Sequence, residues 1–229
     1  MRITLLLTQS LESPGGGGRF FPMAKALARA GHTVTILALH HDFQSLTEKT
    51  SSIDGVTVRY MAQMHVRKVG DQKYYYGTLK LIWISFIATL ALSWAALTTP
   101  CDVIQVCKSQ PFNAIAAWIA HILKRVPVYI DIDDYETLNN RYSHPWQQKV
   151  VAWFEKWMPS FAEHITVSNS VLEKVVMSFG YPAERITVVP HGFDPTRFAV
   201  LDTPDCPARM DAIRNQLDIA QEQRIIVFV

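Results

Sequence analysis

The sequence predicts an α/β fold in which a mostly parallel, doubly wound, Rossmann-like sheet carries helices on both faces. Short apolar runs, typical of buried strands, alternate with helical patterns along most of the 229 residues. Hydrophobic residues make up 49% of the chain and charged residues 18%, which is enough for a large core without disulfides. Clusters of glycine, histidine and aspartate follow several predicted strands, at the edge where ligands of such sheets bind.

The first half of the chain alternates between strand and helix patterns. Residues 2–7, RITLLL, form a continuous apolar run that is typical of a parallel strand covered on both faces. A run of glycines then leads into apolar residues at helical spacing, and this pattern predicts a helix that stops at Gly31. Strands are predicted at 33–39 and 56–61, and a long apolar helix from about 76 to 97.

The same alternation continues in the second half. Its predicted elements are strand 102–107, helix 112–125, strand 127–133, helix 146–160, strand 164–168, helix 170–179 and strand 186–190. Strands separated by helices in this way form crossover units, so the sheet is expected to be mostly parallel.

The C-terminal segment has a different composition. Residues 193–208 are rich in proline and polar side chains and predict a linker, and 208–219 can form a short helix. Residues 224–229, RIIVFV, predict a new buried strand that needs a partner. We therefore expect one domain over 1–198 and the start of a second, incomplete domain over 199–229, with a final edge strand of the first sheet as the alternative.

Charge and cysteine content exclude some classes of protein. The net charge of +2 argues against a nucleic-acid-binding protein, which needs a basic surface. Cys101, Cys107 and Cys206 form no CxxC pair, and this favours a reduced, cytoplasmic protein without a zinc site. The apolar run at the N-terminus is too short for a secretory signal.

Residues 13–34 place four glycines directly before a helical pattern. Backbone N–H groups at a helix N-terminus can bind phosphate or another anion, whereas a flexible turn is the alternative. A dinucleotide fingerprint fits badly, because its third glycine would fall on Phe20 or Phe21, and no Walker lysine follows. The loop is therefore interpreted as a generic anion-binding loop, and a dinucleotide oxidoreductase is disfavoured.

Four segments in a fixed order carry a resemblance to a known family. They are GGGGRFFPMAKALARAGHTVTIL from Gly15, DIDDYE from Asp131, HITVSNSVLEKVVMSFGYPAERITVVPHGFD from His164 and PTRF from Pro195. Together they resemble the N-terminal domain of family 4 glycosyltransferases with the two-domain GT-B architecture. The resemblance covers the chain to about residue 198.

The resemblance implies transfer of a sugar from a nucleotide-diphosphate sugar to an acceptor, with retention at the anomeric carbon. It implies no tightly bound cofactor, and an acceptor that is a glycan, a lipid-linked molecule or another component of the cell envelope, as in polysaccharide biosynthesis. Residues 199–229 would then begin the donor-binding domain. We expect residues 1–229 alone to show negligible transfer activity, since most of the donor site lies in that second domain.

In the family, the glycine loop approaches the donor diphosphate. This implication is carried over to Gly15, Gly16, Gly17 and Gly18, with Gly16 and Gly17 at the centre. Valine at either central position is expected to impair transfer more than stability. Arg19 is implied to contact phosphate or an anionic acceptor, with a solvated residue of the first helical turn as the alternative.

The DIDDYE segment lies near the reacting sugar in the family. Asp133 stands where many relatives have histidine and Asp134 where they have aspartate, so these two are the candidate catalytic residues. They would orient the acceptor or stabilise positive charge at the anomeric carbon; helix capping is the alternative. Crowding among Asp131, Asp133 and Asp134 should raise the pKa of at least one of them.

Further residues are assigned to the acceptor cleft. They are Asp131, His40, His41, Glu136, His191 and Gly192. A structural role is the alternative for His191, and Gly192 is expected to adopt a backbone conformation closed to other residues. His40 and His41 have no correctly spaced third ligand in the sequence, so no metal site is expected.

Residues 81–99 contain no charged side chain and are nearly long enough to span a bilayer. A single crossing would separate strands of one sheet, so a packed helix is expected instead. It is either buried or touches the membrane interface through residues 74–97, which carry tyrosines, tryptophans and lysines.

Two functions therefore stay open. The first is a glycosyltransferase in the cytoplasm, at the inner face of the cell membrane. The second is a non-catalytic module that binds a nucleotide or another anion and accompanies a membrane enzyme. A reading frame that continues beyond Val229 into a second domain would favour the first.

Overall fold

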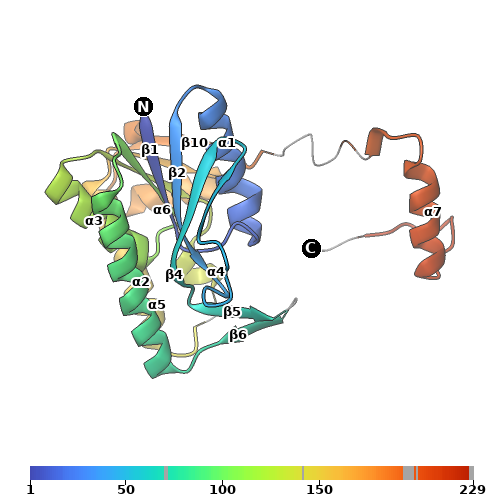
Figure 1. Ribbon diagram of the computed structural model, residues 1–229, viewed down its shortest axis with the longest axis horizontal. Coiled ribbons are helices and arrows are strands. Elements are labelled where there is room, and N and C mark those ends of the chain that lie inside the picture. The colour runs from blue at the N-terminus through green and yellow to red at the C-terminus, as the bar shows by residue number, and fades with distance from the viewer. Residues whose placement is uncertain (70–71, 141, 193–198, 200, 227–229) are drawn as a thin grey trace. The chain divides into compact units, whose positions relative to one another are not determined.

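A computed structural model of the chain describes residues 1–69, 72–140, 142–192, 199 and 201–226 (Figure 1). The chain divides into two compact units, Met1–His191 and Gly192–Val229. The second unit contains α7 (Cys206–Gln216), close to the helix predicted at 208–219. Residues 224–226 have no regular structure, so the described part of the predicted last strand is not a strand; residues 227–229 and most of the predicted linker up to residue 200 lie outside the described residues.

All strands of the described residues lie in the first unit. Eight of them form one sheet in the order β10-β9-β8-β7-β1-β2-β4-β3. Their bounds are β1 Arg2–Leu7, β2 Thr33–His40, β3 Thr50–Ile53, β4 Val56–Gln63, β7 Val103–Cys107, β8 Val128–Ile132, β9 His164–Val167 and β10 Ile186–Val188. Every neighbouring pair is parallel except β3 with β4. The predicted α/β fold with a mostly parallel sheet is confirmed.

The order of the strands reverses at β1, which pairs with β2 on one side and with β7 on the other. Chain connections leave such a switch point in opposite directions, and the crevice between them is where open α/β sheets bind ligands. The loop after β1 carries the glycines, and the loop after β7 begins with Lys108.

Helices cover both faces of the sheet (Figure 1). Their bounds are α1 Phe21–Arg29, α2 Thr78–Thr98, α3 Pro111–Lys124, α4 Glu136–Asn139, α5 Pro145–Trp157 and α6 Ser170–Ser178, with 3-10 turns at Met158–Phe161 and Ala183–Arg185. Successive side chains of β1 alternate between two buried clusters, as the pleat of a strand requires. Leu5 and Leu7 pack with Phe20 on the α1 side, whereas Leu6 packs with Leu92 of α2 on the opposite side.

The sequence patterns missed the short elements. The hairpin of β5 (Val66–Val69) and β6 (Gln72–Tyr75) is antiparallel, and β6 is exposed throughout. Its composition lacks the apolar alternation of a strand packed on a core, so no periodic signal marked it. The edge strand β3 and the helix α4, each four residues long, gave equally weak patterns.

Helix α2 has one buried stripe and one exposed stripe. It packs on α3 and β4 through side chains that include Ile84, Ala88 and Leu92. On the opposite stripe Leu79, Trp83, Phe86, Leu90 and Trp94 are each more than half exposed. The helix is long and apolar enough to cross a membrane by length and composition, and 33% of its most apolar window is buried. The expectation of a wholly buried helix is therefore wrong.

Candidate functional site

Two pockets lie at the carboxyl end of the sheet and share a wall. Pocket A has a volume of about 430 Å³ and pocket B of about 420 Å³. Gln9, Pro14 and Lys108 line both of them. Gln9 follows β1 and Lys108 follows β7, so the shared wall stands at the switch point of the sheet.

Pocket B brings together residues from three of the predicted motifs. Besides the shared wall it is lined by Gly15, Gly18, Arg19, Asp133, Asp134 and His191. These residues come from the glycine segment, the end of β8 and the segment after β10. The glycine segment and the aspartates after β8 therefore lie together at one edge of the sheet, as expected.

Lys108 is the central cation of the site. Its Nζ lies 2.8 Å from Asp134 Oδ2, 3.1 Å from Glu136 Oε1 and 3.3 Å from Asp133 Oδ1. The three carboxylates outweigh burial and raise the pKa of Lys108, so the ammonium stays charged. A group of carboxylates this close would otherwise suit a divalent ion, but here the ammonium already occupies the centre.

The backbone of Lys108 is held in an unusual conformation. Its φ is +76°, a region that residues with a side chain rarely adopt. The Nδ2 of buried Asn113 donates to the carbonyl oxygens of Cys107 (2.8 Å) and Lys108 (2.9 Å), and thereby fixes this turn. Residues held in sparse backbone conformations cluster at functional sites, and this one points its side chain between both pockets.

Asp133 and Asp134 have different environments. The Asp133 side chain is 5% exposed and that of Asp134 is 40% exposed. Burial raises the pKa of Asp133, while Lys108 opposes the shift and Asp134 adds to it. The expected rise in pKa within this segment is confirmed, although its main cause is burial rather than crowding.

Glu136 lies buried on the pocket A side of Lys108. It accepts hydrogen bonds from Gln110 Nε2 (3.0 Å) and Asn140 Nδ2 (2.5 Å) in addition to its ion pair. Behind it, Glu155 of α5 accepts the backbone N–H groups of Glu136 (2.7 Å) and Thr137 (3.0 Å) and so caps α4. Burial raises the pKa of Glu155 to about 7.

Arg19 and Asp131 form a buried bidentate ion pair. Arg19 Nε lies 2.8 Å from Asp131 Oδ1, and an η nitrogen lies 3.0 Å from Oδ2. The guanidinium also donates to the carbonyl oxygen of Val189, and Thr166 Oγ1 donates to Asp131 Oδ2 at 2.7 Å. The alternative of a solvated Arg19 is wrong. Asp131 lines neither pocket; it neutralises Arg19 instead of facing the cleft.

The four glycines fall into two pairs. Within the π-helical turn Gly16–Phe20, a Cβ on Gly16 would lie 2.1 Å from the carbonyl oxygen of Ser10, and one on Gly17 would lie 2.5 Å from that of Leu11. Glycine is needed there because the loop after β1 passes directly against the helix. Valine at either position is therefore expected to lower stability as well as transfer, and whether transfer suffers more, as predicted, stays a prediction. Gly15 and Gly18 are the pair that lines pocket B.

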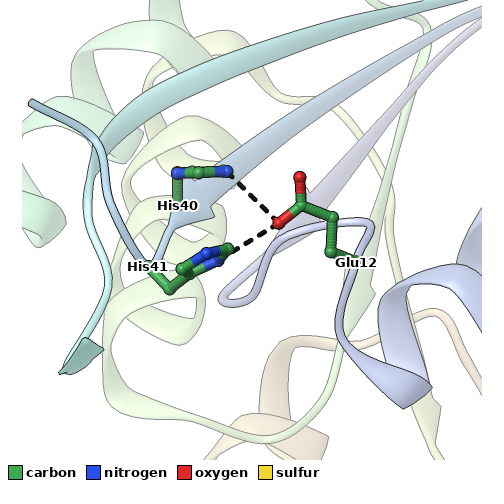
Figure 2. A group of neighbouring side chains, drawn as sticks. All are labelled: Glu12, His40 and His41. Carbon is green, nitrogen blue, oxygen red and sulfur yellow. Dashed lines mark ion pairs between the residues drawn. The ribbon is translucent and has the colours of Figure 1, made fainter. Parts of the chain in front are cut away.

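His40 and His41 meet a carboxylate from a different loop. Figure 2 shows Glu12 pointing toward both rings, with His40 Nε2 at 3.6 Å and His41 Nδ1 at 3.4 Å from Glu12 Oε2. The two rings are stacked with centroids 4.3 Å apart. Burial, together with His40, lowers the pKa of His41. Of this group, His41 lines pocket A.

The turn after β10 differs from the prediction. His191 lines pocket B, and its predicted place in the acceptor cleft stays a prediction. Gly192 does not have a positive φ, and a Cβ there would meet no atom of the described residues within 4 Å. The expected conformation closed to other residues is therefore wrong for Gly192.

Pocket A combines apolar walls with a polar end. Its walls include Leu81 and Ile82 of α2 and Trp146 and Val150 of α5. At its polar end His65 stacks on Phe112, and within the described part of the chain its Nδ1 has no hydrogen-bond partner. Burial lowers the pKa of His65 to about 4. An uncharged imidazole with a free Nδ1 is a hydrogen-bonding group for a ligand.

Sequence reasoning missed Lys108, His65 and Glu12. Lys108 directly follows a predicted strand, so the rule that singled out the aspartates would have found it as well. His65 lies beside a hairpin that gave no signal. Glu12 reaches the histidines only through the tertiary fold.

Comparison with protein families identifies the chain. The model of Glycosyltransferase Family 4 matches residues 15–197, which is most of the sequence. The chain belongs to glycosyltransferase family 4. No curated protein sequence gives a significant match to this family member.

Three solved structures have a similar fold, and the names of the second and third include a sugar nucleotide. Sucrose-phosphate synthase from Thermosynechococcus elongatus has a TM-score of 0.62 at 12% identity, over 97% of this chain and 53% of its own. Anabaena Alr3699/HepE in complex with UDP-glucose has a TM-score of 0.56 at 17% identity, over 96% of this chain and 50% of its own. UDP-GlcNAc 2-epimerase from Methanocaldococcus jannaschii has a TM-score of 0.55 at 12% identity, over 96% of this chain and 54% of its own. The family 4 chain thus spans about half the length of these proteins, and the likeness is one of fold.

Proposed function

We propose that residues 1–191 form the acceptor-side domain of a retaining glycosyltransferase that uses a nucleotide-diphosphate sugar. The observation that carries the proposal is the junction of two pockets at Lys108, with aspartates on one side and an apolar, partly polar chamber on the other. A transferase must place two substrates against each other, and two adjoining pockets provide room for both.

In this proposal pocket B receives the sugar-diphosphate end of the donor. Gly18 leaves room for the diphosphate at the start of the helical segment, and Gly15 lines the same pocket beside the Gln9 side chain. Asp134, the more exposed aspartate, accepts hydrogen bonds from sugar hydroxyl groups, and the negative charge of this segment stabilises positive charge that develops at the anomeric carbon. Asp133 and Lys108 hold that segment in place.

Pocket A would then take the acceptor, and its walls favour an amphiphilic, lipid-linked one. Lys68 and Lys73 line it from opposite strands of the β5–β6 hairpin and have no carboxylate partner among the described residues. Two ammonium groups beside apolar walls suit a lipid that carries phosphate. Because the exposed stripe of α2 adjoins Leu81 and Ile82, the proposal places the domain on the inner face of a membrane.

The test is a transfer assay with the protein translated from the whole natural reading frame that contains residues 1–229. A panel of labelled nucleotide sugars is supplied with a lipid extract of the producing cell, and the anomeric configuration of the product is read by NMR. Asp134→Asn is expected to lower kcat by about 100-fold, as loss of one stabilising group does. Glu163→Gln, at an exposed position outside both pockets, is the matched control.

Transfer with inversion would contradict the retaining mechanism. Binding of the nucleotide sugar without transfer to any acceptor would instead support the non-catalytic module.

A further inference from the structure

The cluster of Glu12, His40 and His41 has a feature that glycosyl transfer does not explain. The His40 side chain is 5% exposed, and its Nε2 has no hydrogen-bond partner among the described residues. Buried polar atoms in native proteins are almost always satisfied, so an unpartnered one needs a reason. Figure 2 shows this nitrogen pointing toward the carboxylate of Glu12, at a distance of 3.6 Å that is too long for an N–H···O bond.

The spacing of the three groups matches a coordination shell. Two ligands bound tetrahedrally at about 2.1 Å from a zinc ion lie about 3.4 Å from each other. The distances from Glu12 Oε2 are 3.4 Å to His41 Nδ1 and 3.6 Å to His40 Nε2, and all three ligand atoms lie within 4.8 Å of one another. Two imidazoles and one carboxylate are a donor set that zinc and similar ions prefer.

We propose that Glu12, His40 and His41 form a binding site for a divalent transition metal ion of the zinc class. Three protein ligands leave one coordination position for water or a substrate oxygen. Since His41 lines pocket A, that position lies beside this pocket. The ion would also fix the loop that precedes the glycine segment, because Glu12 belongs to that loop.

Coordination requires a defined change at His40. The backbone N–H of Asp42 now donates to His40 Nδ1 at 3.0 Å, so in the neutral ring the proton resides on Nε2. A metal bound to Nε2 takes the lone pair of that atom, which moves the proton to Nδ1. The Asp42 amide must then give up its bond to the ring, and Asp42 lies in a turn that can adjust. The amide signal of Asp42 is therefore a fingerprint of coordination by His40.

The experiment measures zinc binding to untagged residues 1–229 by competition with a chromophoric chelator, in a Cys206→Ser background that removes the more accessible thiol. The expected result is one bound zinc ion per chain. Glu12→Gln and His41→Ala should each weaken it by at least about tenfold. The Glu12 side chain is 62% exposed, so its variant should fold with an unchanged Tm. Asp134→Asn, in the other cluster of acidic groups, is the matched control and should bind zinc as before.

A second readout separates the site from adventitious binding. In a proton–nitrogen correlation spectrum, zinc should shift the Asp42 amide signal in the parent protein and leave it in place in the Glu12→Gln variant. The proposal is overturned if zinc does not bind, if both ligand variants bind it with unchanged affinity, or if zinc binds without moving the Asp42 signal. None of these outcomes depends on the glycosyltransferase activity, so the two proposals can fail separately.

Discussion

At the scale of single residues, the glycine segment serves two purposes at neighbouring positions. Gly16 lies under the backbone of Ser10, where no side chain fits, whereas a Cβ on Gly18 would be more than 4 Å from every atom that the structure describes. Gly18 is exposed and borders pocket B. Packing therefore explains one glycine and access to the pocket explains the other.

This difference predicts opposite effects of alanine. Gly16→Ala should lower the free energy of unfolding by about 1–3 kcal/mol, because its Cβ forces the Ser10 carbonyl away. Gly18→Ala is the matched control and should leave stability unchanged or slightly higher. Urea unfolding monitored by circular dichroism measures both, and equal losses for the two variants would contradict the packing argument.

Lys108 predicts a large effect on stability. Lys108→Met should cost about 3–5 kcal/mol, because it leaves Asp133 and Glu136 buried without their cation. Adding Asp134→Asn to this variant should restore part of the loss, since it removes one of the repelling charges. Lys149→Met, at an exposed position of α5, is the control. An unchanged midpoint for Lys108→Met would show that the carboxylates do not need the ammonium.

Glu155 predicts a dependence of stability on pH. Its pKa is raised from 4.5 to about 7 in the folded chain, so the folded state binds the proton more tightly than the unfolded state. Stability should therefore fall as pH rises through this window, by up to about 3 kcal/mol in total. Thermal unfolding between pH 5 and pH 8 measures the slope. Glu155→Gln should flatten it, and an equally steep slope in that variant would assign the effect to another group.

At the scale of elements, α2 combines a core stripe with an outer stripe of large apolar side chains. Exposed tryptophans also lie on α3 and α5, where Trp118 is 39% and Trp153 is 57% exposed. Tryptophan is enriched at membrane interfaces, where an apolar ring with one polar N–H is stable. Lys80 lies over the Tyr76 ring at 5.0 Å, at the start of the same helix.

These elements predict binding to anionic membranes. Residues 1–229 should sediment with vesicles that contain phosphatidylglycerol. Replacing Trp83 and Trp94 together by glutamine should weaken this by at least about tenfold, because both rings leave the interface. The same change at Val171 and Met177 on α6, which are also exposed, should have little effect. Equal losses in both pairs would mean that the vesicles bind exposed apolar surface without regard to position.

Elements with a buried periodic face could be predicted from the sequence, and short or polar ones could not. β1 and β2 are continuous apolar runs because both faces are covered, and α3 begins at Pro111 with the expected spacing. β6 is exposed along its whole length and α4 spans a single turn held by Glu155, a residue from α5. Tertiary contacts create such elements, so local patterns do not mark them.

At the scale of the whole molecule, the first unit holds the complete sheet. Arg19, in the helical turn that precedes α1, connects this turn to β8 through Asp131. It also connects it to the segment after β10 through the carbonyl oxygen of Val189. We predict that residues 1–191 unfold at the same Tm as residues 1–229, since the unit has its own core. Scanning calorimetry of both chains measures this. A fall of several degrees on shortening would show that the second unit stabilises the first.

The candidate site was predictable in position more than in detail. Strand order places the ends of β1, β7 and β8 together, so the meeting of the glycine segment with Asp133 and Asp134 followed from topology. The partners of each side chain did not follow. Arg19 binds Asp131, and Glu12 reaches the histidines, through contacts between residues far apart in the sequence.

The position of Lys108 has a consequence for how the two pockets influence each other. The single ammonium of Lys108 lines both pockets and is shared among three carboxylates. Its positive charge therefore acts on a ligand in either pocket. An anionic group that draws it toward one chamber weakens the neutralisation felt in the other. Under the proposed function, binding of one substrate would therefore change the electrostatic environment that the second substrate meets.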